Sequence, residues 1–285
     1  MKNIHAWTGL LKIRLSLAVT FSAVTGSLLY DNSPGPDILI MIGGVFILAC
    51  GAAALNQYTE RVHDARMDRT MHRPIPGERI EPGNALLLAI ILLITGLSIL
   101  LITGFIPAFF GSLAVFLYNF VYTALKQVSW FAVVPGALVG AIPPLIGFTA
   151  AGGQGPDTAI ILFSSFMFLW QLPHFWLIIL RYRSDYLKAG FKTLPANIDD
   201  RLTKSLVFAW VTVTSILLAL FSVKELVFDR VISMILIPMN ICFILLFYRF
   251  LFRPGENKGV KTAFILINAF SLAVMLLFIF NTFLA

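Results

Sequence analysis

Residues 85–104 read ALLLAIILLITGLSILLITG, and residues 106–125 read IPAFFGSLAVFLYNFVYTAL. Neither run contains a charged side chain. A helix needs about 20 mostly apolar residues to cross the hydrocarbon core of a bilayer, and each run has that length. Because only Gly104 and Pro107 interrupt the two runs, we expect two membrane helices joined by a tight turn.

The composition of the whole chain supports the same interpretation. Of its 285 residues, 59% are hydrophobic and 12% are charged, and Phe alone occurs 26 times. A soluble domain carries about 25% charged residues. This chain lacks the polar side chains needed to cover its surface in water, so we expect most of that surface to contact lipid. Cys50 and Cys242 lie within apolar runs without metal-ligand spacing, and we expect both to be apolar fillers.

Nine apolar stretches are long enough to be membrane helices. They are residues 12–30, 37–55, 85–104, 106–125, 130–150, 158–180, 205–223, 228–248 and 262–284. With nine spans, 19 of the 21 Lys and Arg side chains fall on one side of the membrane, and only Lys224 and Arg230 fall on the other. Because positive charge is enriched in cytoplasmic loops, we expect a cytoplasmic N-terminus and a C-terminus on the opposite face. The expected fold class is all-α, a polytopic membrane protein in which residues 1–285 form a single membrane-embedded domain.

Two loops on the predicted cytoplasmic side, 56–84 and 181–204, are long and dense in charge. In the first, polar side chains recur at every fourth residue, at Asn56, Glu60, Asp64 and Asp68, which places them on one face of a helix. Like charges at this spacing destabilise a bare helix, so we expect cations nearby. These oxygen ligands suit Mg²⁺, which takes one or two carboxylates and shares its other positions with water and phosphates. The alternative is a solvated, salt-bridged helix.

Cationic residues near the same membrane edge suit a lipid diphosphate, because guanidinium groups bind phosphate oxygens through two donors at once. The candidates are Lys12, Arg14, Arg69, Arg73, Lys126 and Arg183, together with the hydroxyl of Tyr182. In the second loop, Asp185 is a candidate to complete the metal site. The alternative is that these charges only anchor the spans at lipid headgroups.

The end of the sixth predicted span carries Trp170, Gln171 and His174. Gln171 and His174 are three residues apart and share a helix face. A neutral imidazole inside a membrane bundle is able to ligate a metal, and haem iron is a common partner. The alternative is a histidine that only hydrogen-bonds a neighbouring helix.

Several of these segments, in order along the chain, resemble the haem O synthases (protohaem IX farnesyltransferases) of the UbiA-type intramembrane prenyltransferases. The segments are residues 56–64, 67–76, 122–126, 140–147, 170–175 and 185–190. The resemblance implies nine transmembrane helices around a central cavity. It also implies farnesyl diphosphate and haem b as substrates, Mg²⁺ as cofactor, and haem O and diphosphate as products.

The resemblance assigns roles to the matching positions. It implies that the metal is held by Asn56, Glu60, Asp64 and Asp185, which with Lys126 form the catalytic set. It implies that the diphosphate is held by Arg14, Arg69, Arg73, Lys126 and Arg183. Tyr182 is a further diphosphate candidate from its place in the second loop, and His174, Trp170 and Gln171 are the candidates for contact with haem. The sequence departs from the family pattern at Ile13 in place of Pro, Glu60 in place of Asp, Gln127 in place of Arg, and Ala189 in place of an acidic residue.

These departures from the family pattern bear on the identity of the prenyl acceptor more than on the fold. One alternative is a prenyltransferase that acts on a quinone or another aromatic acceptor. A second is a haem carrier or transporter without chemistry, although a transporter places its polar residues near the bilayer midplane and this chain gathers them at the cytoplasmic edge. The expected location is a bacterial or archaeal plasma membrane. The expected partners are membrane lipid and other haem-pathway or oxidase-assembly membrane proteins, and not nucleic acid.

Overall fold

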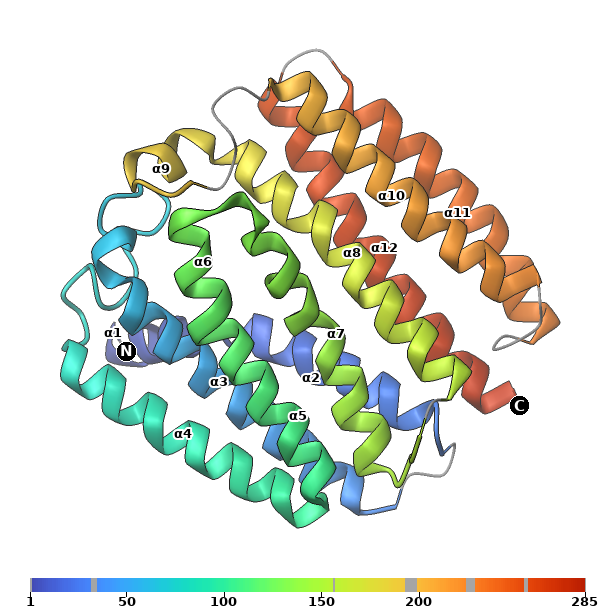
Figure 1. Ribbon diagram of the computed structural model, residues 1–285, viewed down its shortest axis with the longest axis horizontal. Helices are drawn as coiled ribbons and strands as arrows, with labels where there is room; N and C mark the ends of the chain where they lie inside the picture. Colours follow the sequence, from blue (N-terminus) through green and yellow to red (C-terminus); the bar gives the residue numbers. More distant parts are fainter. Residues whose placement is uncertain are drawn as a thin grey trace. The chain divides into compact units, whose positions relative to one another are not determined.

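The computed structural model describes residues 2–31, 35–155, 157–192, 199–223, 229–253 and 256–284, and within these ranges the chain is helical without any β-strand (Figure 1). The chain forms two compact units. Unit 1 holds residues 1–153 and 184–193, and unit 2 holds residues 154–183 and 194–285. Of the sequence predictions, Lys224 and the first residue of the predicted span 228–248 lie outside the described residues. The single domain expected over residues 1–285 stays a prediction.

Unit 1 contains α1 (Lys2–Leu11), α2 (Ile13–Leu28), α3 (Asp37–Asp64), α4 (Pro82–Thr103), α5 (Phe105–Phe116), the π-helix η1 (Leu117–Tyr122), α6 (Thr123–Val128), the 3-10 turn η2 (Trp130–Ala132), α7 (Val133–Ala150) and most of α9 (Arg183–Lys188). Unit 2 contains α8 (Thr158–Arg181), α10 (Asp200–Val223), α11 (Arg230–Leu251) and α12 (Glu256–Leu284).

Eight helical stretches in the described residues are long and apolar enough to cross a membrane, with Phe105–Val128 counted as one stretch. The pair Ile4–Leu11 and Ile13–Leu28, bent by 41°, makes a ninth if it forms one span. The prediction of an all-α polytopic membrane protein is therefore confirmed. The tight turn between α4 and α5 is also confirmed, and Gly104 has a φ of 144° there, a backbone conformation that suits only glycine.

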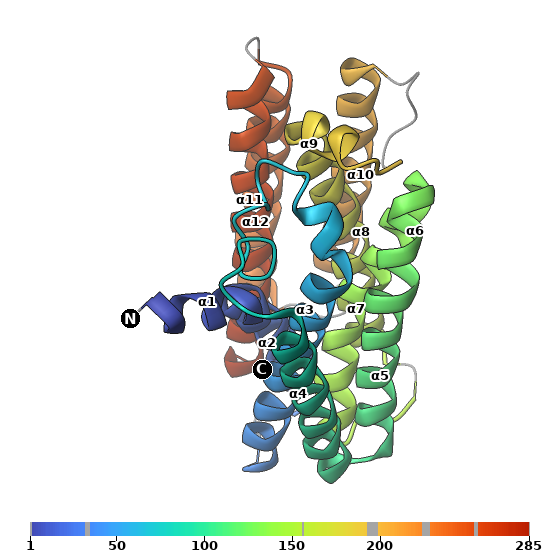
Figure 2. The same cartoon turned by 90° about the vertical axis from the view of Figure 1, so that its left-hand side faces the viewer.

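The N-terminal span differs from its prediction. A helix starting near residue 12 was expected, whereas the chain is already helical from Lys2 and breaks at Lys12. Lys12 has a φ of 46°, in the left-handed region that non-glycine residues rarely occupy. Figure 2 shows α1 lying across the direction of α5 and α6. The break matters because it directs the Lys12 side chain toward α3, as described below.

Small residues bring the helices of unit 1 into close contact. A Cβ atom on Gly147 of α7 would lie 1.8 Å from the backbone oxygen of Ala23 on α2, and one on Gly26 would lie 2.1 Å from the oxygen of Pro144. A Cβ on Gly96 of α4 would lie 2.6 Å from the backbone nitrogen of Leu48 on α3. Membrane helices associate through such close backbone approach, because lipid gives them little hydrophobic reason to pair.

Large aromatic side chains fill the interior of unit 2. Phe243 on α11 stacks on Phe270 of α12 with ring centroids 3.9 Å apart. Phe163 on α8 packs against Phe278 of α12 at 4.7 Å. Pairs of this kind join α8, α11 and α12 without polar atoms, as a membrane bundle requires.

Candidate active site at the end of helix α3

The site begins with three polar side chains on the buried face of α3, at its C-terminal end. Asn56, Glu60 and Asp64 are 2%, 3% and 0% exposed. The four-residue spacing therefore does place them on one face, as predicted, and we call these three residues the acidic ladder. Two carboxylates buried one helical turn apart repel each other, so the helix can hold them only where cations lie close by.

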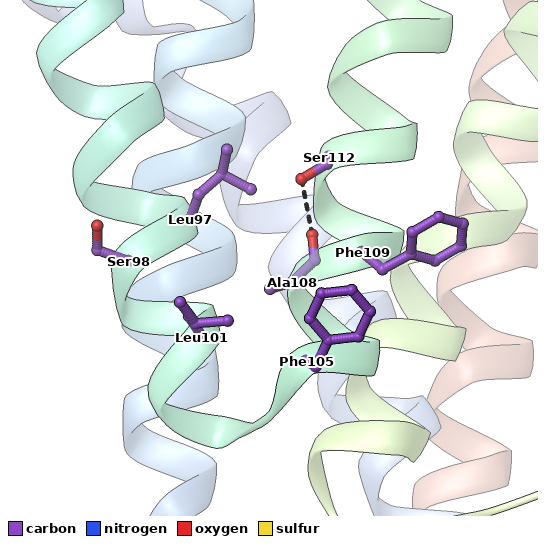
Figure 3. Close-up of a pocket in the computed structure, with 7 residues that line it drawn as sticks. All are labelled: Leu97, Ser98, Leu101, Phe105, Ala108, Phe109 and Ser112. Atoms are coloured by element: carbon purple, nitrogen blue, oxygen red, sulfur yellow. Dashed lines mark hydrogen bonds between the residues drawn. The ribbon is translucent and has the colours of Figure 1, made fainter.

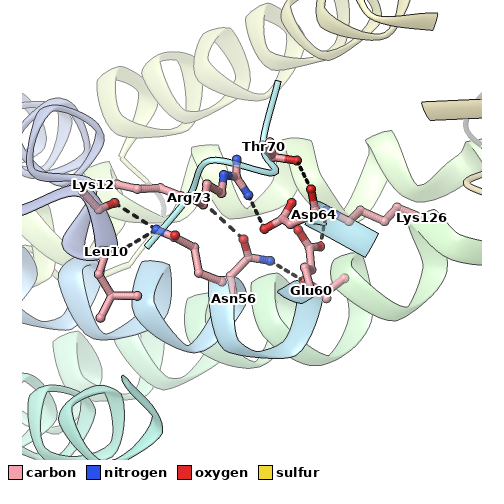
Figure 4. Close-up of polar contacts among 11 residues, drawn as sticks. Leu10, Lys12, Asn56, Glu60, Asp64, Thr70, Arg73 and Lys126 are labelled. Atoms are coloured by element: carbon pink, nitrogen blue, oxygen red, sulfur yellow. Dashed lines mark hydrogen bonds and ion pairs between the residues drawn. The ribbon is translucent and has the colours of Figure 1, made fainter. Parts of the chain in front are cut away.

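Each rung of the acidic ladder has its own cation, and the three cations come from three other elements (Figure 4). Lys126 of α6 forms an ion pair with Glu60. Arg73, in the loop after α3, places Nη1 2.7 Å from Oδ2 of Asp64. Lys12, between α1 and α2, donates from Nζ to Oδ1 of Asn56 at 3.3 Å. The loop, the helix break and α6 therefore converge on one face of α3.

Asp64 has the features of a metal ligand. Its Oδ1 atom is buried and has no hydrogen-bond partner among the described residues, while Oδ2 is taken by Arg73. A free carboxylate oxygen at a buried position is costly unless a cation joins it. With the oxygens of Glu60 and Asn56 on the same face, the donor set is made of hard oxygens and fits Mg²⁺. Within the described residues, no group of three or more His, Cys, Asp or Glu side chains is already gathered around a point, and Mg²⁺ does not require one.

The second acidic candidate, Asp185 on α9, docks onto the loop after α3. Asp185 is 6% exposed, and its Oδ2 accepts a hydrogen bond from the backbone N–H of Arg69 at 3.1 Å. Within unit 1, Asp185 and the acidic ladder are therefore linked through the same short loop, which runs from Asp64 to Arg73. The structure thus brings Asp185 to the loop that carries Arg69 and Arg73.

Asp68 does not extend the acidic ladder. The helix α3 ends at Asp64, so the fourth residue of the series leaves the helical face. Asp68 is exposed and accepts a hydrogen bond from Lys188 at 2.7 Å, which raises the pKa of the Lys188 ammonium. The four-residue spacing continues past the end of the helix, so the sequence pattern predicted four residues on this helix face where the helix carries three.

Aromatic side chains surround the ammonium group of Lys126. Its Nζ lies 5.2 Å from the ring centroid of Tyr122 and 5.3 Å from that of Phe191. Phe191 also stacks on His63 with ring centroids 5.0 Å apart and is 4% exposed. A cation between two ring faces is held by their quadrupoles, so Phe191 and Tyr122 restrict where Lys126 can point.

The predicted haem contacts lie in unit 2. His174 of α8 has its ring 4.9 Å from that of Trp170 and 5.0 Å from that of Phe264 on α12. Trp170 donates from Nε1 to the backbone oxygen of Ile267 at 2.9 Å. The Nδ1 atom of His174 is buried and has no hydrogen-bond partner among the described residues. Gln171 is half-buried on the same helix. These residues form an aromatic cluster in unit 2, in which the His174 ring also hydrogen-bonds the side chain of Asn268 and leaves its Nδ1 atom for a further interaction.

Three more predicted diphosphate ligands are Arg183 and Tyr182, which belong to unit 2, and Arg14, which belongs to unit 1. Arg183 pairs with Asp200 at 2.6 Å within unit 2. Tyr182 lies under the guanidinium of Arg181, whose carbon is 5.1 Å from the ring centroid. Arg14 is exposed near the start of α2. Their roles in binding diphosphate stay predictions.

Sequence reasoning missed several members of the site. Thr123 is 1% exposed and hydrogen-bonds to Asn56, and His63 and Phe191 pack against each other beside Lys126. Thr123 lies next to the motif residue Tyr122, and His63 precedes Asp64, so their positions offered a signal. Phe191 is one of 26 phenylalanines, and nothing in its local sequence separates it from the others.

A cavity of about 310 Å³ lies elsewhere in unit 1, between α4 and α5 (Figure 3). It is lined by Leu97, Ser98, Leu101, Phe105, Ala108, Phe109 and Ser112. None of these residues is charged, and the hydroxyl of Ser112 already donates to the backbone oxygen of Ala108 at 2.9 Å. An anionic substrate finds no partner there, so this cavity is unsuited to diphosphate chemistry.

The chain is similar to known proteins along most of its length. Residues 18–272 match the UbiA prenyltransferase family. A protoheme IX farnesyltransferase of Flavobacterium psychrophilum is 34% identical over 281 residues, which cover 96% of this chain and 93% of that protein. A protein of the same name from Geobacter sulfurreducens is 41% identical over 181 residues, which cover 64% of this chain and 67% of that protein.

Solved structures share the fold. A UbiA homologue from Archaeoglobus fulgidus bound to GPP and Mg²⁺ superposes with a TM-score of 0.76 over 98% of both chains, at 18% identity. A structure described in work on digeranylgeranylglyceryl phosphate synthase superposes with a TM-score of 0.78 over 99% of both chains, at 16% identity. At these identities the likeness establishes the fold.

Proposed function

Because the chain belongs to the UbiA prenyltransferase family, we propose that it transfers a farnesyl group from farnesyl diphosphate to a vinyl group of haem b, giving haem O and diphosphate. The observation that carries this proposal is the acidic ladder, whose buried oxygens are matched by three cations at one end of α3. The similarity to protoheme IX farnesyltransferases along nearly the whole chain supports haem as the acceptor.

The charges of the site suit a diphosphate. Lys12, Arg73 and Lys126 lie against Asn56, Asp64 and Glu60, so three basic side chains gather at one buried helix face. Oxygens of the diphosphate would therefore be attracted to Arg73 and Lys126. Asn56, Glu60, Asp64 and Asp185 would hold Mg²⁺, which when bound supplies positive charge that stabilises the leaving group.

The chemistry then requires no protein nucleophile. The bond between C1 of the farnesyl chain and the diphosphate oxygen breaks with its electron pair on the diphosphate, and an allylic cation is left. Arg73 and Lys126 stabilise the charge that develops on the leaving oxygen. The haem vinyl group attacks C1 and forms the new carbon–carbon bond. Water adds to the resulting haem-side cation and loses a proton, which completes the hydroxyfarnesylethyl substituent.

The acceptor would be bound by residues of unit 2. The rings of His174, Trp170 and Phe264 provide an apolar wall for a porphyrin, and the Nδ1 atom of His174 supports a contact with haem iron or a propionate. Gln171, one helical turn from His174, would add a hydrogen bond. Arg14, Arg69, Tyr182 and Arg183 would bind the diphosphate once it arrives.

The direct test is a reaction of detergent-purified protein with haem b, farnesyl diphosphate and Mg²⁺, analysed by mass spectrometry. The expected product is heavier than haem b by one farnesyl group and one hydroxyl group, and EDTA abolishes it. A parallel reaction with Asp64→Asn controls for uncatalysed coupling. If the folded wild-type protein gives no such product but prenylates a quinone-type acceptor, haem is the wrong acceptor. If it prenylates none, the enzyme hypothesis fails in favour of a carrier.

The protein is an integral membrane protein, and we place it in a plasma membrane with its N-terminus in the cytoplasm. The distribution of Lys and Arg between the loops supports this orientation. An alkaline phosphatase domain fused after residue 285 should be active in a bacterial host, because the enzyme folds only outside the cytoplasm. A fusion at residue 77, in the loop between α3 and α4, should be inactive. The reverse pattern would invert the orientation.

A further inference from the structure

The side-chain amide of Asn56 has two different neighbours within unit 1. Its Nδ2 donates to Oγ1 of Thr123 at 3.0 Å, and its Oδ1 accepts from Nζ of Lys12 at 3.3 Å. An amide has an oxygen at one corner and an NH₂ group at the other, with nearly the same shape. Rotating the amide by 180° would therefore exchange the positions of its oxygen and its NH₂ group, and only the hydrogen bonds determine which orientation it adopts.

The hydroxyl of Thr123 fixes this choice together with the ammonium group of Lys12, which can only donate, because the single proton of Thr123 is already used. Thr123 Oγ1 donates to the backbone oxygen of Tyr118 at 2.8 Å, five residues earlier. The oxygen atom can then only accept, and it requires an NH₂ group from its neighbour. Asn56 consequently faces Thr123 with Nδ2 and turns Oδ1 toward the cations of the site.

The π-helix η1 provides the carbonyl that fixes Thr123. Threonines elsewhere in the described membrane helices bond three or four residues back, as Thr103 does to the oxygen of Leu100 and Thr20 does to the oxygen of Ser16, both at 2.8 Å. At the end of η1 the helical register is one residue wider, and the backbone N–H of Thr123 also bonds the oxygen of Tyr118. A π-helix of this kind is often found at functional sites. Here it directs the threonine proton into the helix and away from Asn56.

We propose that Thr123 is a positioning residue, which holds the Asn56 amide with Oδ1 presented to the metal–diphosphate site. The inference rests on the proposed function, because it gives Asn56 a metal to bind. An amide coordinates a cation through its oxygen only. With the amide reversed, an NH₂ group would face the cation and oppose its binding. Thr123 is 1% exposed and accepts a hydrogen bond from Asn56, and we expect it to act on the metal through that side chain.

The test measures metal binding directly, with Mn²⁺ as the probe and farnesyl diphosphate present, by electron paramagnetic resonance. Thr123→Val keeps the shape of the side chain and removes the hydroxyl, and we expect roughly tenfold weaker Mn²⁺ binding. Thr123→Ser keeps the hydroxyl and should bind Mn²⁺ within about twofold of wild type. Thr123→Cys, whose thiol is a poor acceptor, should behave like Thr123→Val and replaces it if the valine variant does not fold.

A second comparison separates positioning from packing. In an Asn56→Asp background both corners of the side chain are oxygens, so its orientation no longer matters. Adding Thr123→Val to Asn56→Asp should therefore cause no further loss of Mn²⁺ binding, whereas a packing role would cause the same loss in both backgrounds. Wild-type Mn²⁺ affinity in folded Thr123→Val, or equal losses in Thr123→Ser and Thr123→Val, would overturn the proposal. If wild-type protein itself fails to bind Mn²⁺, the metal site and this inference fall together.

Discussion

Because α2 and α7 are in close contact, we expect Gly147→Ala, which adds a single methyl group, to lower the stability of the protein markedly. The new Cβ would lie 1.8 Å from the backbone oxygen and 2.7 Å from the backbone carbon of Ala23. Ordinary contacts of a Cβ begin at about 3.4 Å, and both neighbours are backbone atoms that cannot rotate away. The two helices must therefore separate by more than an ångström. Overpacking of this kind costs about 1–3 kcal/mol.

The consequence should reach the active site. The chain enters α2 directly after Lys12 and reaches α7 shortly after Lys126, so moving these helices apart shifts both cations relative to the acidic ladder. We expect Gly147→Ala to lower the apparent Tm in detergent by roughly 2–12 °C, at about 2–4 °C per kcal/mol, and to lower prenyl transfer with it.

The matched control is Gly43→Ala on α3, where an added Cβ has no neighbour within 4 Å. Alanine is a better helix former than glycine, so this variant should keep or slightly raise the apparent Tm. Differential scanning fluorimetry of the purified variants measures both. A Gly147→Ala protein that unfolds within about a degree of wild type would refute the packing argument and the close approach of the two helices.

Three further outcomes follow from the site. Asp64→Asn should lower turnover roughly 100-fold or more while the apparent Tm stays near that of wild type, and near-normal activity would remove Asp64 from the metal site. Phe191→Leu should lower kcat/KM for farnesyl diphosphate about threefold, because Lys126 loses one of its two ring faces, and an unchanged kcat/KM would contradict this role. Lys188→Gln should leave thermal unfolding unchanged, since its pair with Asp68 is exposed, and a clear loss of stability would show that α9 depends on that contact.

Composition and charge alone predicted the class of fold. The apolar stretches were found because a bilayer demands a minimum length and tolerates few charges, so each span can be recognised locally. The acidic ladder was found for a similar reason, because the four-residue spacing of Asn56, Glu60 and Asp64 reports one helix face. Both features depend only on residues close together in the sequence.

Features that depend on distant residues could not be predicted in the same way. The partner of Arg183 is Asp200, and that of Asp68 is Lys188, 120 residues away. Several acidic or basic residues have the charge to form each pair, and only the tertiary fold determines which of them does. The left-handed backbone at Lys12 was also hidden, because a lysine carries no sign of positive φ. The sequence offered candidate residues for the site without determining which cation meets which oxygen.

Each residue of the acidic ladder is contacted by a cation from a different structural element. The folding of unit 1 and its chemistry therefore depend on the same contacts. Lys12, Arg73 and Lys126 reach α3 from a helix break, a loop and α6, and no two of them share an element. Removing one cation leaves a buried oxygen without its partner, which destabilises the fold as well as the transition state. Loss of activity in Lys126→Ala would therefore not by itself identify a catalytic role. Only variants that keep the charge and change its geometry, such as Arg73→Lys, separate the two contributions, because they preserve neutralisation and lose the paired donors that a diphosphate uses.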